Sequence, residues 1–309
     1  MAGIISTDSI ALIVPTLNPQ KTWNVLQGNI QQQTYLPRNI LIIDSSSDDG
    51  FGENLEEIGF SLIQIQRADF NHGGTRQLGV DKFPTAKIII FLTQDSIPAH
   101  ATAFDKLLSK FEDPKVGIVY GRQLPRQKAG PIEAHSRHYN YPSESRVREL
   151  KDSSDLGIRA AFCSNSFAAY RRTALEAVGG FQENAIFGED MLVTAKMLKQ
   201  GWKVAYAADA QVYHSHPYGF RDEFRRSFDI GVFHTQESWL LEQFGKAEGE
   251  GLQFVRSEIR YLLKNNKSLL PSALARNFLK YAGYRLGREF KWLPRSIRQQ
   301  FSMNSGYWR

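Results

Sequence analysis

The sequence predicts an α/β protein with a mostly parallel central sheet flanked by helices, followed by a helical C-terminal part. Short apolar runs that end in turn residues alternate with helical patterns over the first 120 residues, and the pattern after Pro217 is helical. Strands that alternate with helices of about ten to fifteen residues favour crossover connections, which make the strands parallel and cover both faces of the sheet. The chain has 309 residues, of which 42% are hydrophobic and 23% charged, so it is long enough for this architecture.

Five apolar segments predict the strands of the first half of the chain. Each is short and is followed by turn residues, and they lie at 10–14, 39–43, 62–66, 87–92 and 116–120. The segment 87–92 (KIIIFL) has no polar residue after Lys87, which is typical of a central strand buried on both faces. Helical patterns between the segments predict helices at 21–33, 74–82 and 102–111.

The second half of the chain mixes ordered segments with one irregular stretch. Apolar residues at 160–170 and 203–213 predict further strands, and a helix is expected at 189–200 because Gly201 suits the position after a helix C-terminus. Residues 122–155 contain three prolines and many charges without periodicity. We therefore expect a long loop there, either functional or a solvated insertion.

The positive charge of the chain is concentrated at its C-terminal end. The net charge is +6, but residues 264–309 hold ten Lys or Arg and a single acid, Glu289, so this segment is +9 and the first 263 residues are −3. Apolar residues such as Phe278, Tyr281 and Trp292 are interleaved with these cations. That composition is typical of a surface that meets an anionic membrane, and the alternative is a helical extension packed on the rest of the protein or on a second copy.

Several features favour a soluble or peripheral protein in a reducing compartment over an integral membrane protein. The first 18 residues lack the basic start and long apolar core of a secretory signal. No apolar run approaches the roughly 20 residues of a membrane-spanning helix. The single cysteine, Cys163, excludes a disulfide within the chain and fits a reducing compartment.

Polar residues follow the predicted strands where their carboxyl ends would meet. In open parallel sheets, ligands bind at this edge. The residues are Thr16 and Asn18 after the first strand, Asp44 and Ser45 after the second, Arg76 after the third, and Gln94 and Asp95 after the fourth. An acid after the second strand suits a ribose or base edge, and one after the central strand suits a divalent metal that bridges phosphates. The glycine spacings of dinucleotide-binding oxidoreductases and of P-loop enzymes are absent from the sequence.

Five motifs in order give the chain a resemblance to family 2 glycosyltransferases, and most to the bacterial rhamnosyltransferase branch. They are VPTLN at 14–18, IIDSSSDDG at 42–50, FNHGGTRQLG at 70–79, FLTQDSIP at 91–98 and GEDMLVTAKMLKQGW at 188–202, with a further likeness in FRRSFDIGVFH at 224–234. The resemblance implies inverting transfer by one nucleotide-sugar-binding domain of the A-type transferase fold at 1–217. The helical, basic extension would then occupy 218–309.

The resemblance also implies roles for the polar residues at the strand ends. It makes candidate nucleotide-sugar contacts of Thr16, Asn18, Asp44, Ser45, Arg76, Gln94 and Asp95. Asp95 takes the place of the family's acidic metal-binding motif, of which only this carboxylate remains, since positions 93 and 94 are Thr and Gln. His214 is similar to the family's additional ligand of Mg²⁺ or Mn²⁺. His216 falls on the same side of an extended chain, so the choice between the two stays open.

Glu189 and Asp190 begin a predicted helix, where acids also occur simply as caps. In the family the second acid is the general base, so the resemblance makes Asp190 the group that takes the proton from the acceptor hydroxyl. Glu189 and Trp202, which lie in the same motif, are expected to contact the acceptor. Arg76 and the metal would stabilise the leaving diphosphate.

The resemblance thus predicts transfer of L-rhamnose from dTDP-L-rhamnose to a hydroxyl of a growing cell-surface polysaccharide, O-antigen-like or capsular, on a lipid carrier. The residues themselves leave other UDP- or dTDP-sugars open. A sugar nucleotidyltransferase is less favoured because VPTLNPQ lacks a Gly-rich, basic loop after the first strand. A nucleic-acid-binding protein would explain the basic tail but not the acidic strand ends, so no nucleic-acid partner is expected. Residues 122–155 would form an acceptor-side loop.

Overall fold

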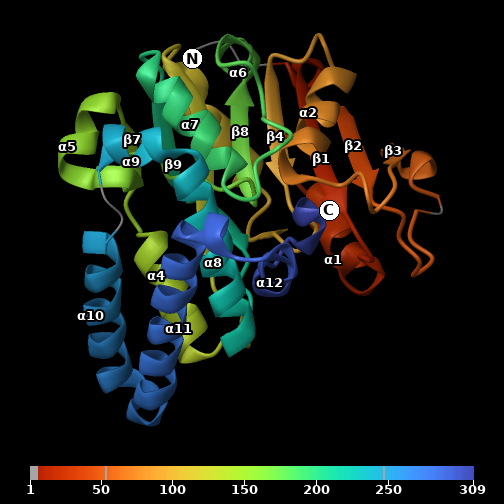
Figure 1. Cartoon of the computed structure of the whole chain (residues 1–309). Coiled ribbons are helices and arrows are strands. Elements are labelled where there is room, and N and C mark those ends of the chain that lie inside the picture. The colour runs from red at the N-terminus through yellow and green to blue at the C-terminus, as the bar shows by residue number, and fades with distance from the viewer. Residues whose placement is uncertain (1–5, 53, 246–247) are drawn as a thin grey trace.

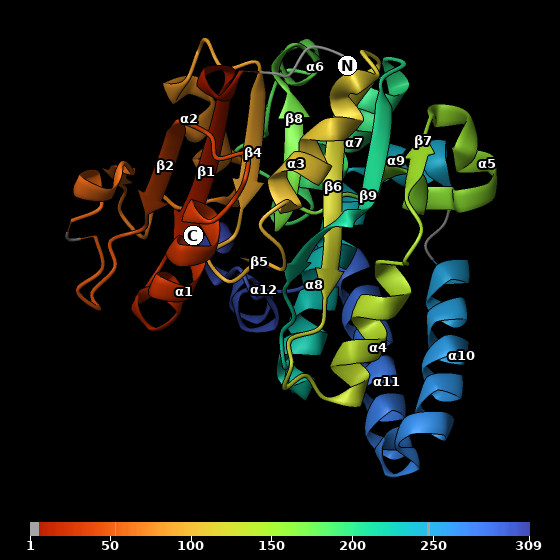
Figure 2. The same cartoon turned by 180° about the vertical axis from the view of Figure 1, so that it is seen from behind.

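One nine-stranded mixed sheet forms the centre of the computed structural model, which describes residues 6–52, 54–245 and 248–309. The strands follow the order β3-β2-β1-β4-β8-β6-β9-β5, and β7 pairs with β9 (Figures 1 and 2). Residues 1–5, on which part of the argument against a secretory signal rests, lie outside the described residues. Among those that are described, no helix combines the length and the hydrophobicity needed to cross a bilayer.

The sheet is mostly parallel, as predicted. Neighbouring strands from β3 to β4 are parallel, β6 is parallel to β9, and β8 lies antiparallel between β4 and β6. The strands are β1 (Ile10–Thr16), β2 (Asn39–Asp44), β3 (Ser61–Gln64), β4 (Ile88–Leu92), β5 (Ile97–Pro98), β6 (Val116–Leu124), β7 (Arg146–Arg148), β8 (Phe167–Arg171) and β9 (Lys203–Tyr213). All five residues of β4 are buried, which confirms the central strand expected from its sequence.

Helices cover both faces of the sheet and then form a cluster of their own. Within the described residues they are α1 (Gln20–Gln31), α2 (His72–Lys82), α3 (Ala103–Leu108), α4 (Pro131–Asn140), α5 (Ser153–Leu156), α6 (Arg172–Ala177), α7 (Glu189–Lys199), α8 (Phe220–Gln236), α9 (Ser238–Phe244), α10 (Glu248–Asn265), α11 (Leu270–Arg288) and α12 (Arg295–Phe301). Alternate residues of β1 belong to two hydrophobic cores: Ile10 and Leu12 share one with residues of α1 and α3, and Ile13 shares the other with residues of α2 and α7.

The long loop expected at 122–155 is wrong. The strand β6 continues to Leu124, α4 and β7 follow, and a short helical stretch ends with α5. Pro131 indicates a helix break in the sequence, but it stands in the first turn of α4. A backbone N–H at that position has no partner within the helix, so a proline there costs no hydrogen bond. The strand predicted at 160–170 is also too long, since β8 begins only at Phe167.

The C-terminal helices share their core with the sheet. Phe228, Phe290 and Trp308 belong to the same buried cluster as Ile13 and Phe91. A change to helical structure does occur near residue 217, but the residues on either side of it do not have separate hydrophobic cores.

Three glycines bring α8 and α11 into backbone contact. A Cβ atom at Gly287 would lie 2.1 Å from the backbone oxygen of Phe228, and one at Gly283 would lie 2.4 Å from that of Phe224. At Gly231 it would lie 2.3 Å from the backbone oxygen of Tyr284. After α12 the chain returns to α8, where the Asp229 carboxylate accepts hydrogen bonds from the backbone N–H groups of Met303 and Asn304 at 2.9 and 3.3 Å.

Candidate active site

The ends of β1 and β2 are joined through the carboxylate of Asp44. Its Oδ1 accepts hydrogen bonds from the hydroxyls of Thr16 (2.9 Å) and Ser47 (2.5 Å), and its Oδ2 accepts one from the backbone N–H of Ser47 (2.8 Å). Asp44 is only 1% exposed, and the hydroxyl of the neighbouring Ser45 has no hydrogen-bond partner among the described residues. The carboxylate therefore fixes the two strand ends, and nucleotide contacts from Thr16, Asp44 and Ser45 stay predictions.

Asn18 and Gln94 hold the loop after β1 in place. Asn18 has a left-handed backbone (φ +48°), and its N–H donates to the Ser47 hydroxyl at 2.8 Å. The Gln94 carboxamide accepts from the Leu17 N–H at 2.7 Å and donates to the Leu17 carbonyl at 2.9 Å. Both side chains shape the surface that would receive a nucleotide, and their direct contact with one stays a prediction.

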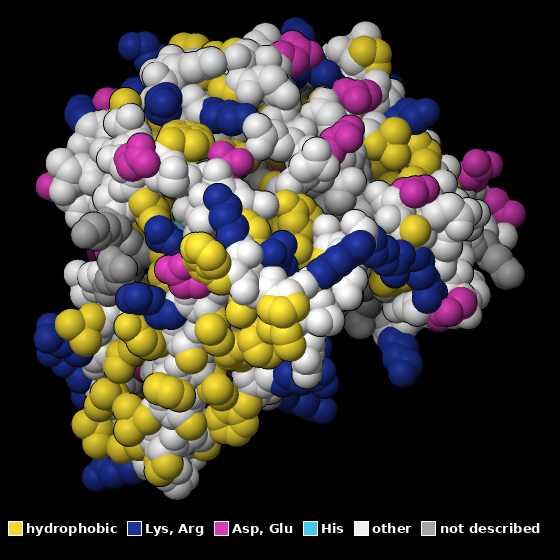
Figure 3. Space-filling model, in the orientation of Figure 1, with side chains coloured by type: hydrophobic (Ala, Val, Ile, Leu, Met, Phe, Trp, Pro, Cys, Tyr) yellow, Lys and Arg dark blue, Asp and Glu magenta, His cyan; other side chains and the backbone are white. Residues whose placement is uncertain are grey.

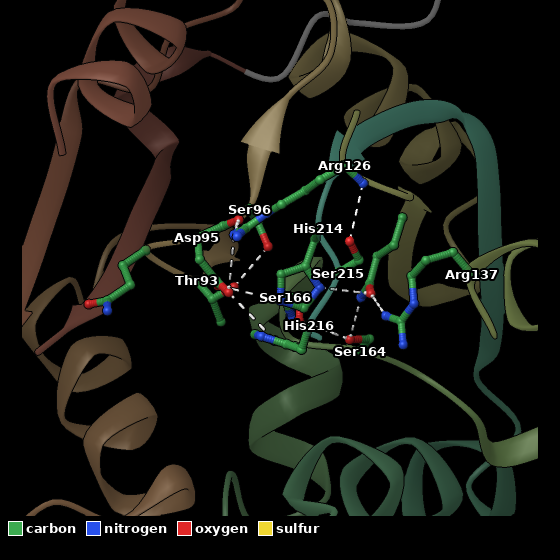
Figure 4. Close-up of polar contacts among 12 residues, drawn as sticks. Thr93, Asp95, Ser96, Arg126, Arg137, Ser164, Ser166, His214, Ser215 and His216 are labelled. Atoms are coloured by element: carbon green, nitrogen blue, oxygen red, sulfur yellow. Dashed lines mark hydrogen bonds and ion pairs between the residues drawn. The ribbon is translucent and has the colours of Figure 1, made fainter. Parts of the chain in front are cut away.

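Asp95, His214 and His216 come together at the ends of β4 and β9 (Figure 4). The Nε2 atoms of His214 and His216 lie 3.4 and 3.5 Å from the two carboxylate oxygens of Asp95, and one ligand atom from each residue lies within 4.8 Å of the others. Burial alone would raise the pKa of Asp95, but a hydrogen bond from His214 and the nearby imidazoles outweigh it and hold the pKa well below its usual range. Burial and the neighbouring His214 lower the pKa of His216 to about 4, so its ring is neutral at pH 7.

The side chain of Gln123 sets which nitrogen of His214 faces Asp95. Gln123 Oε1 accepts from the guanidinium of Arg137 at 2.5 Å, which identifies this atom as the oxygen, because arginine is only a donor. The same oxygen lies 2.9 Å from His214 Nδ1, so Nδ1 carries the proton there. With Nδ1 protonated, the hydrogen bond from Nε2 to Asp95 requires a fully protonated ring, and in neutral His214 Nε2 instead presents a lone pair to the Asp95 carboxylate. Two acceptors that face each other in this way fit a shared divalent cation.

Glu189, the first residue of α7, forms a buried ion pair with Arg76. Its Oε1 lies 3.1 Å from Arg76 Nη1 and accepts a hydrogen bond from Asn165 Nδ2 at 3.1 Å. Burial would raise the pKa of Glu189, but the Arg76 guanidinium, the nearby His72 and the hydrogen bond from Asn165 together outweigh it and keep the pKa below its usual value. Glu189 and Arg76 are 7% and 5% exposed. The structure thus pairs these two side chains with each other, and a diphosphate contact from Arg76 and an acceptor contact from Glu189 stay predictions.

Asp190, the next residue, has the opposite electrostatic surroundings. Its carboxylate accepts hydrogen bonds from the backbone N–H groups of Asn165 (3.2 Å) and Met191 (2.8 Å). Desolvation and the negative charge of Glu189 nevertheless raise the pKa of Asp190 to about 7. Such a carboxylate takes up a proton near neutral pH, which is the property of a general base.

A polar tripeptide, Ser164, Asn165 and Ser166, connects the two groups of residues. The Ser164 hydroxyl accepts from Gln123 Nε2 at 2.9 Å, Asn165 binds both acids of α7, and the Ser166 carbonyl accepts from the Thr93 N–H at 3.2 Å. Thr93 stands two residues before Asp95, so the metal-ligand cluster and Asp190 are positioned by one short segment. The arrangement combines a candidate cation site with a carboxylate whose pKa is raised to about 7.

Comparison with known proteins agrees with this geometry. The model of the family described as "Glycosyltransferase like family 2" matches residues 8–228. The chain belongs to this family. It is 47% identical over 302 residues to the O-antigen chain rhamnosyltransferase RfbN of Salmonella typhimurium, and 44% identical over 301 residues to WbaN of Salmonella anatum, which has the same description. Each match covers 97% of this chain and 96% of the relative.

Solved structures of glycosyltransferases share the fold. A mannosyltransferase from Pyrobaculum calidifontis in complex with GDP-Man and Mn²⁺ has a TM-score of 0.56 at 19% identity, covering 97% of this chain and 84% of its own. TarS residues 1–349 from S. aureus in complex with UDP has a TM-score of 0.54 at 14% identity, covering 91% and 90%. The protein is therefore a family 2 glycosyltransferase with the A-type fold.

Sequence reasoning missed two residues of this glycosyltransferase site. Gln123 fell in the presumed loop, and Asn165 fell in the presumed strand, where three successive polar residues in an apolar run were the available signal. Trp202 precedes β9 and packs beside Gly117 at the start of β6, whereas His214 follows the other end of β9. The whole strand separates Trp202 from the metal-ligand cluster, and its expected acceptor contact stays a prediction.

Proposed function

We propose that this glycosyltransferase moves L-rhamnose from dTDP-L-rhamnose, with inversion, to a hydroxyl of a growing O-antigen-like polysaccharide on a lipid carrier. The observation that carries the proposal is the 47% identity with an O-antigen chain rhamnosyltransferase over nearly the full length of both chains. A site with one raised-pKa carboxylate and no activated nucleophile among its described residues supports direct displacement.

Asp190 is the base in this mechanism. Its carboxylate takes the proton of the acceptor hydroxyl while the acceptor oxygen attacks the anomeric carbon from the side opposite the diphosphate. The new glycosidic C–O bond forms as the bond to the diphosphate oxygen breaks, and the configuration inverts. Backbone N–H groups of Asn165 and Met191 keep the carboxylate oriented, and Glu189 keeps it basic.

Asp95, His214 and His216 would hold a divalent metal ion. When bound, the ion supplies positive charge beside the departing diphosphate. Carboxylate oxygen alone suits Mg²⁺, whereas the mixture of carboxylate and imidazole favours Mn²⁺. Arg126, whose Nη2 lies 3.5 Å from Asp95 Oδ2, is the cation next to this set.

We place the enzyme on the cytoplasmic face of the plasma membrane, held there by its C-terminal helices. Phe278 and Trp292 are 69% and 85% exposed, and cations such as Arg285 and Lys291 lie near them in the sequence. Apolar side chains flanked by Lys and Arg favour an anionic bilayer surface.

A panel of nucleotide sugars tests the donor. We expect dTDP-L-rhamnose with Mn²⁺ to raise the melting temperature more than dTDP-glucose, UDP-galactose or GDP-mannose does, since a ligand at about 100 times its Kd adds about 2.7 kcal/mol of stability. Removing metal with EDTA should reduce the shift. NMR of the product should show an anomeric configuration opposite to that of the donor. A larger shift with another nucleotide sugar would overturn the rhamnosyl assignment.

A further inference from the structure

A large groove opens between α4, α8, α10 and α11, directly beside the metal-ligand cluster. Its volume is about 900 Å³, at the upper end of the range for small-molecule sites. His216, one of the three candidate metal ligands, lines its inner end together with Tyr218, whose ring stacks on that of His216 at 5.2 Å. A molecule in this groove can therefore reach the site where the sugar is transferred.

The groove carries an excess of positive charge. Its walls contain four cations, Arg137, Arg226, Arg276 and Lys280, against the two carboxylates of Glu133 and Glu223. Glu223 holds both cations of α11, with Arg276 at 3.7 Å and Lys280 at 3.5 Å. Arg226 stacks over Phe187, two residues before Glu189. Arg226 thus lies between the groove and the start of α7, where Asp190 stands.

The outer wall is apolar and continues onto the surface. Val255 of α10 lines the groove, and so do Leu252 and Tyr281, which are 53% and 58% exposed. Figure 3 shows hydrophobic side chains gathered over α10 and α11, with Lys and Arg at the edges of that area. An apolar chain that leaves the groove past Leu252 would remain in contact with apolar side chains.

We infer that this groove binds the lipid-diphosphate end of the acceptor, with the anionic head at Arg226, Arg276 and Lys280 and the hydrocarbon chain against Leu252 and Val255. The inference rests on the proposed function, because it takes the acceptor to be lipid-linked. A free saccharide has neither the charge that these cations match nor the chain that the aliphatic wall matches. A nucleotide sugar has the diphosphate but no hydrocarbon chain.

Farnesyl diphosphate, used below its micellar concentration, is the probe that tests this inference by calorimetry on the full chain. The measurement is made in EDTA, so that diphosphate binding through a metal at Asp95 does not contribute. We expect farnesyl diphosphate to bind at least about tenfold more tightly than inorganic diphosphate or farnesol, since each lacks one half of the recognised structure. Inorganic diphosphate or farnesol binding as tightly as farnesyl diphosphate would overturn the inference.

Two substitutions in the groove should each weaken the probe about tenfold or more. Lys280→Gln removes a cation, and Val255→Glu places a charge against the hydrocarbon chain. Phe278→Gln is the matched control, because Phe278 is on the same helix as Lys280 and is exposed, but does not line the groove. If Lys280→Gln and Val255→Glu bind the probe as the wild type does, the site is elsewhere and the inference fails.

Competition separates the acceptor from other sources of the same chemistry. Farnesyl diphosphate should raise the KM for a lipid-linked acceptor and leave the KM for dTDP-L-rhamnose unchanged. Short-chain phosphatidylglycerol that binds as tightly as the probe would make the groove a site for bilayer lipids and overturn the acceptor role. The melting-temperature shift with nucleotide sugars is measured on the same variants. If nucleotide sugars give no shift in the wild type, the proposed function is contradicted. The calorimetry with farnesyl diphosphate tests the groove independently of that result.

Discussion

The edge of the sheet around Asp95 and the start of α7 around Asp190 place the same side chain in opposite electrostatic surroundings. Asp95 faces two imidazoles and the guanidinium of Arg126, and its pKa is held well below the usual range. Asp190 stands next to Glu189, and its pKa is raised to about 7. The first carboxylate stays ionised and suits a permanent metal ligand, and the second suits an exchanging proton. The neighbours of each aspartate, more than the aspartate itself, decide its chemistry.

Asp190→Asn should have the largest effect on transfer, and it best distinguishes the role of Asp190 from that of Asp95. Transfer should fall by about 10³-fold or more, since asparagine cannot take a proton. Binding of dTDP-L-rhamnose, measured by calorimetry, should stay close to that of the wild type. Because the pKa of Asp190 is higher in the folded protein than in the unfolded chain, the ionised carboxylate lowers the free energy of unfolding at pH 8. The variant, which is neutral at this position, should therefore have a melting temperature at pH 8 no lower than that of the wild type. Near-normal turnover in this variant would remove Asp190 from the mechanism.

Asp95→Asn should reduce transfer by on the order of 10²-fold, because charge stabilisation of the diphosphate is lost while the base remains. In contrast with the change at Asp190, donor binding should weaken and should no longer respond to Mn²⁺. His214→Asn and His216→Asn, titrated with Mn²⁺ in parallel, decide which ring is the stronger ligand. A metal response that persists in Asp95→Asn would contradict the cluster as the metal site.

Gln123→Leu tests whether the partner of His214 tunes the metal site. Loss of the hydrogen bond to Nδ1 frees the ring to rotate or change tautomer, and metal affinity should fall about 10- to 100-fold. The pH dependence of transfer at saturating Mn²⁺ should keep the apparent pKa of the wild type, because Asp190 is untouched. Ser164→Ala, which removes only the next hydrogen bond in the chain of contacts, is the control and should have a smaller effect. Unchanged Mn²⁺ affinity in Gln123→Leu would overturn this role.

The smallest expected effect is on the pH profile. In the wild type, kcat/KM should fall as the pH drops below about 7, because the protonated form of Asp190 cannot act as a base. Glu189→Gln removes the neighbouring negative charge and should move this limb to lower pH while turnover at high pH changes only a few-fold. Arg76→Lys, which keeps the charge pair, should leave the limb near its original position. A profile that shifts equally in both variants would assign the raised pKa to another cause.

The sheet and its functional edge follow from the sequence because strand burial is a local signal. Segments such as 87–92 are apolar throughout, and the residues that follow parallel strands meet at one edge whatever the packing elsewhere. This logic places Asp95 at that edge, and the resemblance to family 2 glycosyltransferases adds His214 beside it as a metal ligand. The loop error at 122–155 also has a local cause, since Pro131 reads as a helix breaker unless the helix is known to begin there.

Side-chain pairings across the core did not follow from the sequence. Arg76 and Glu189 are far apart along the chain, and their contact depends on how α2 packs against the start of α7. The sequence alone therefore predicts a phosphate contact for Arg76 but not its ion pair with Glu189. The role of Asn165 was equally hidden, because it consists of hydrogen bonds to Glu189 and Asp190 of α7.

The return of the chain to α8 has a practical consequence for handling the protein. Removing residues 302–309 would deprive Asp229 of the backbone N–H groups of Met303 and Asn304, and would expose the rings of Phe228 and Phe290 that pack on Trp308. Asp229 is part of the helix whose Phe233 lies beside Gly188, the residue before Glu189 and Asp190. Trimming the basic end to improve solubility would therefore damage the scaffold of the active site, and a soluble variant is better sought at exposed side chains such as Trp292.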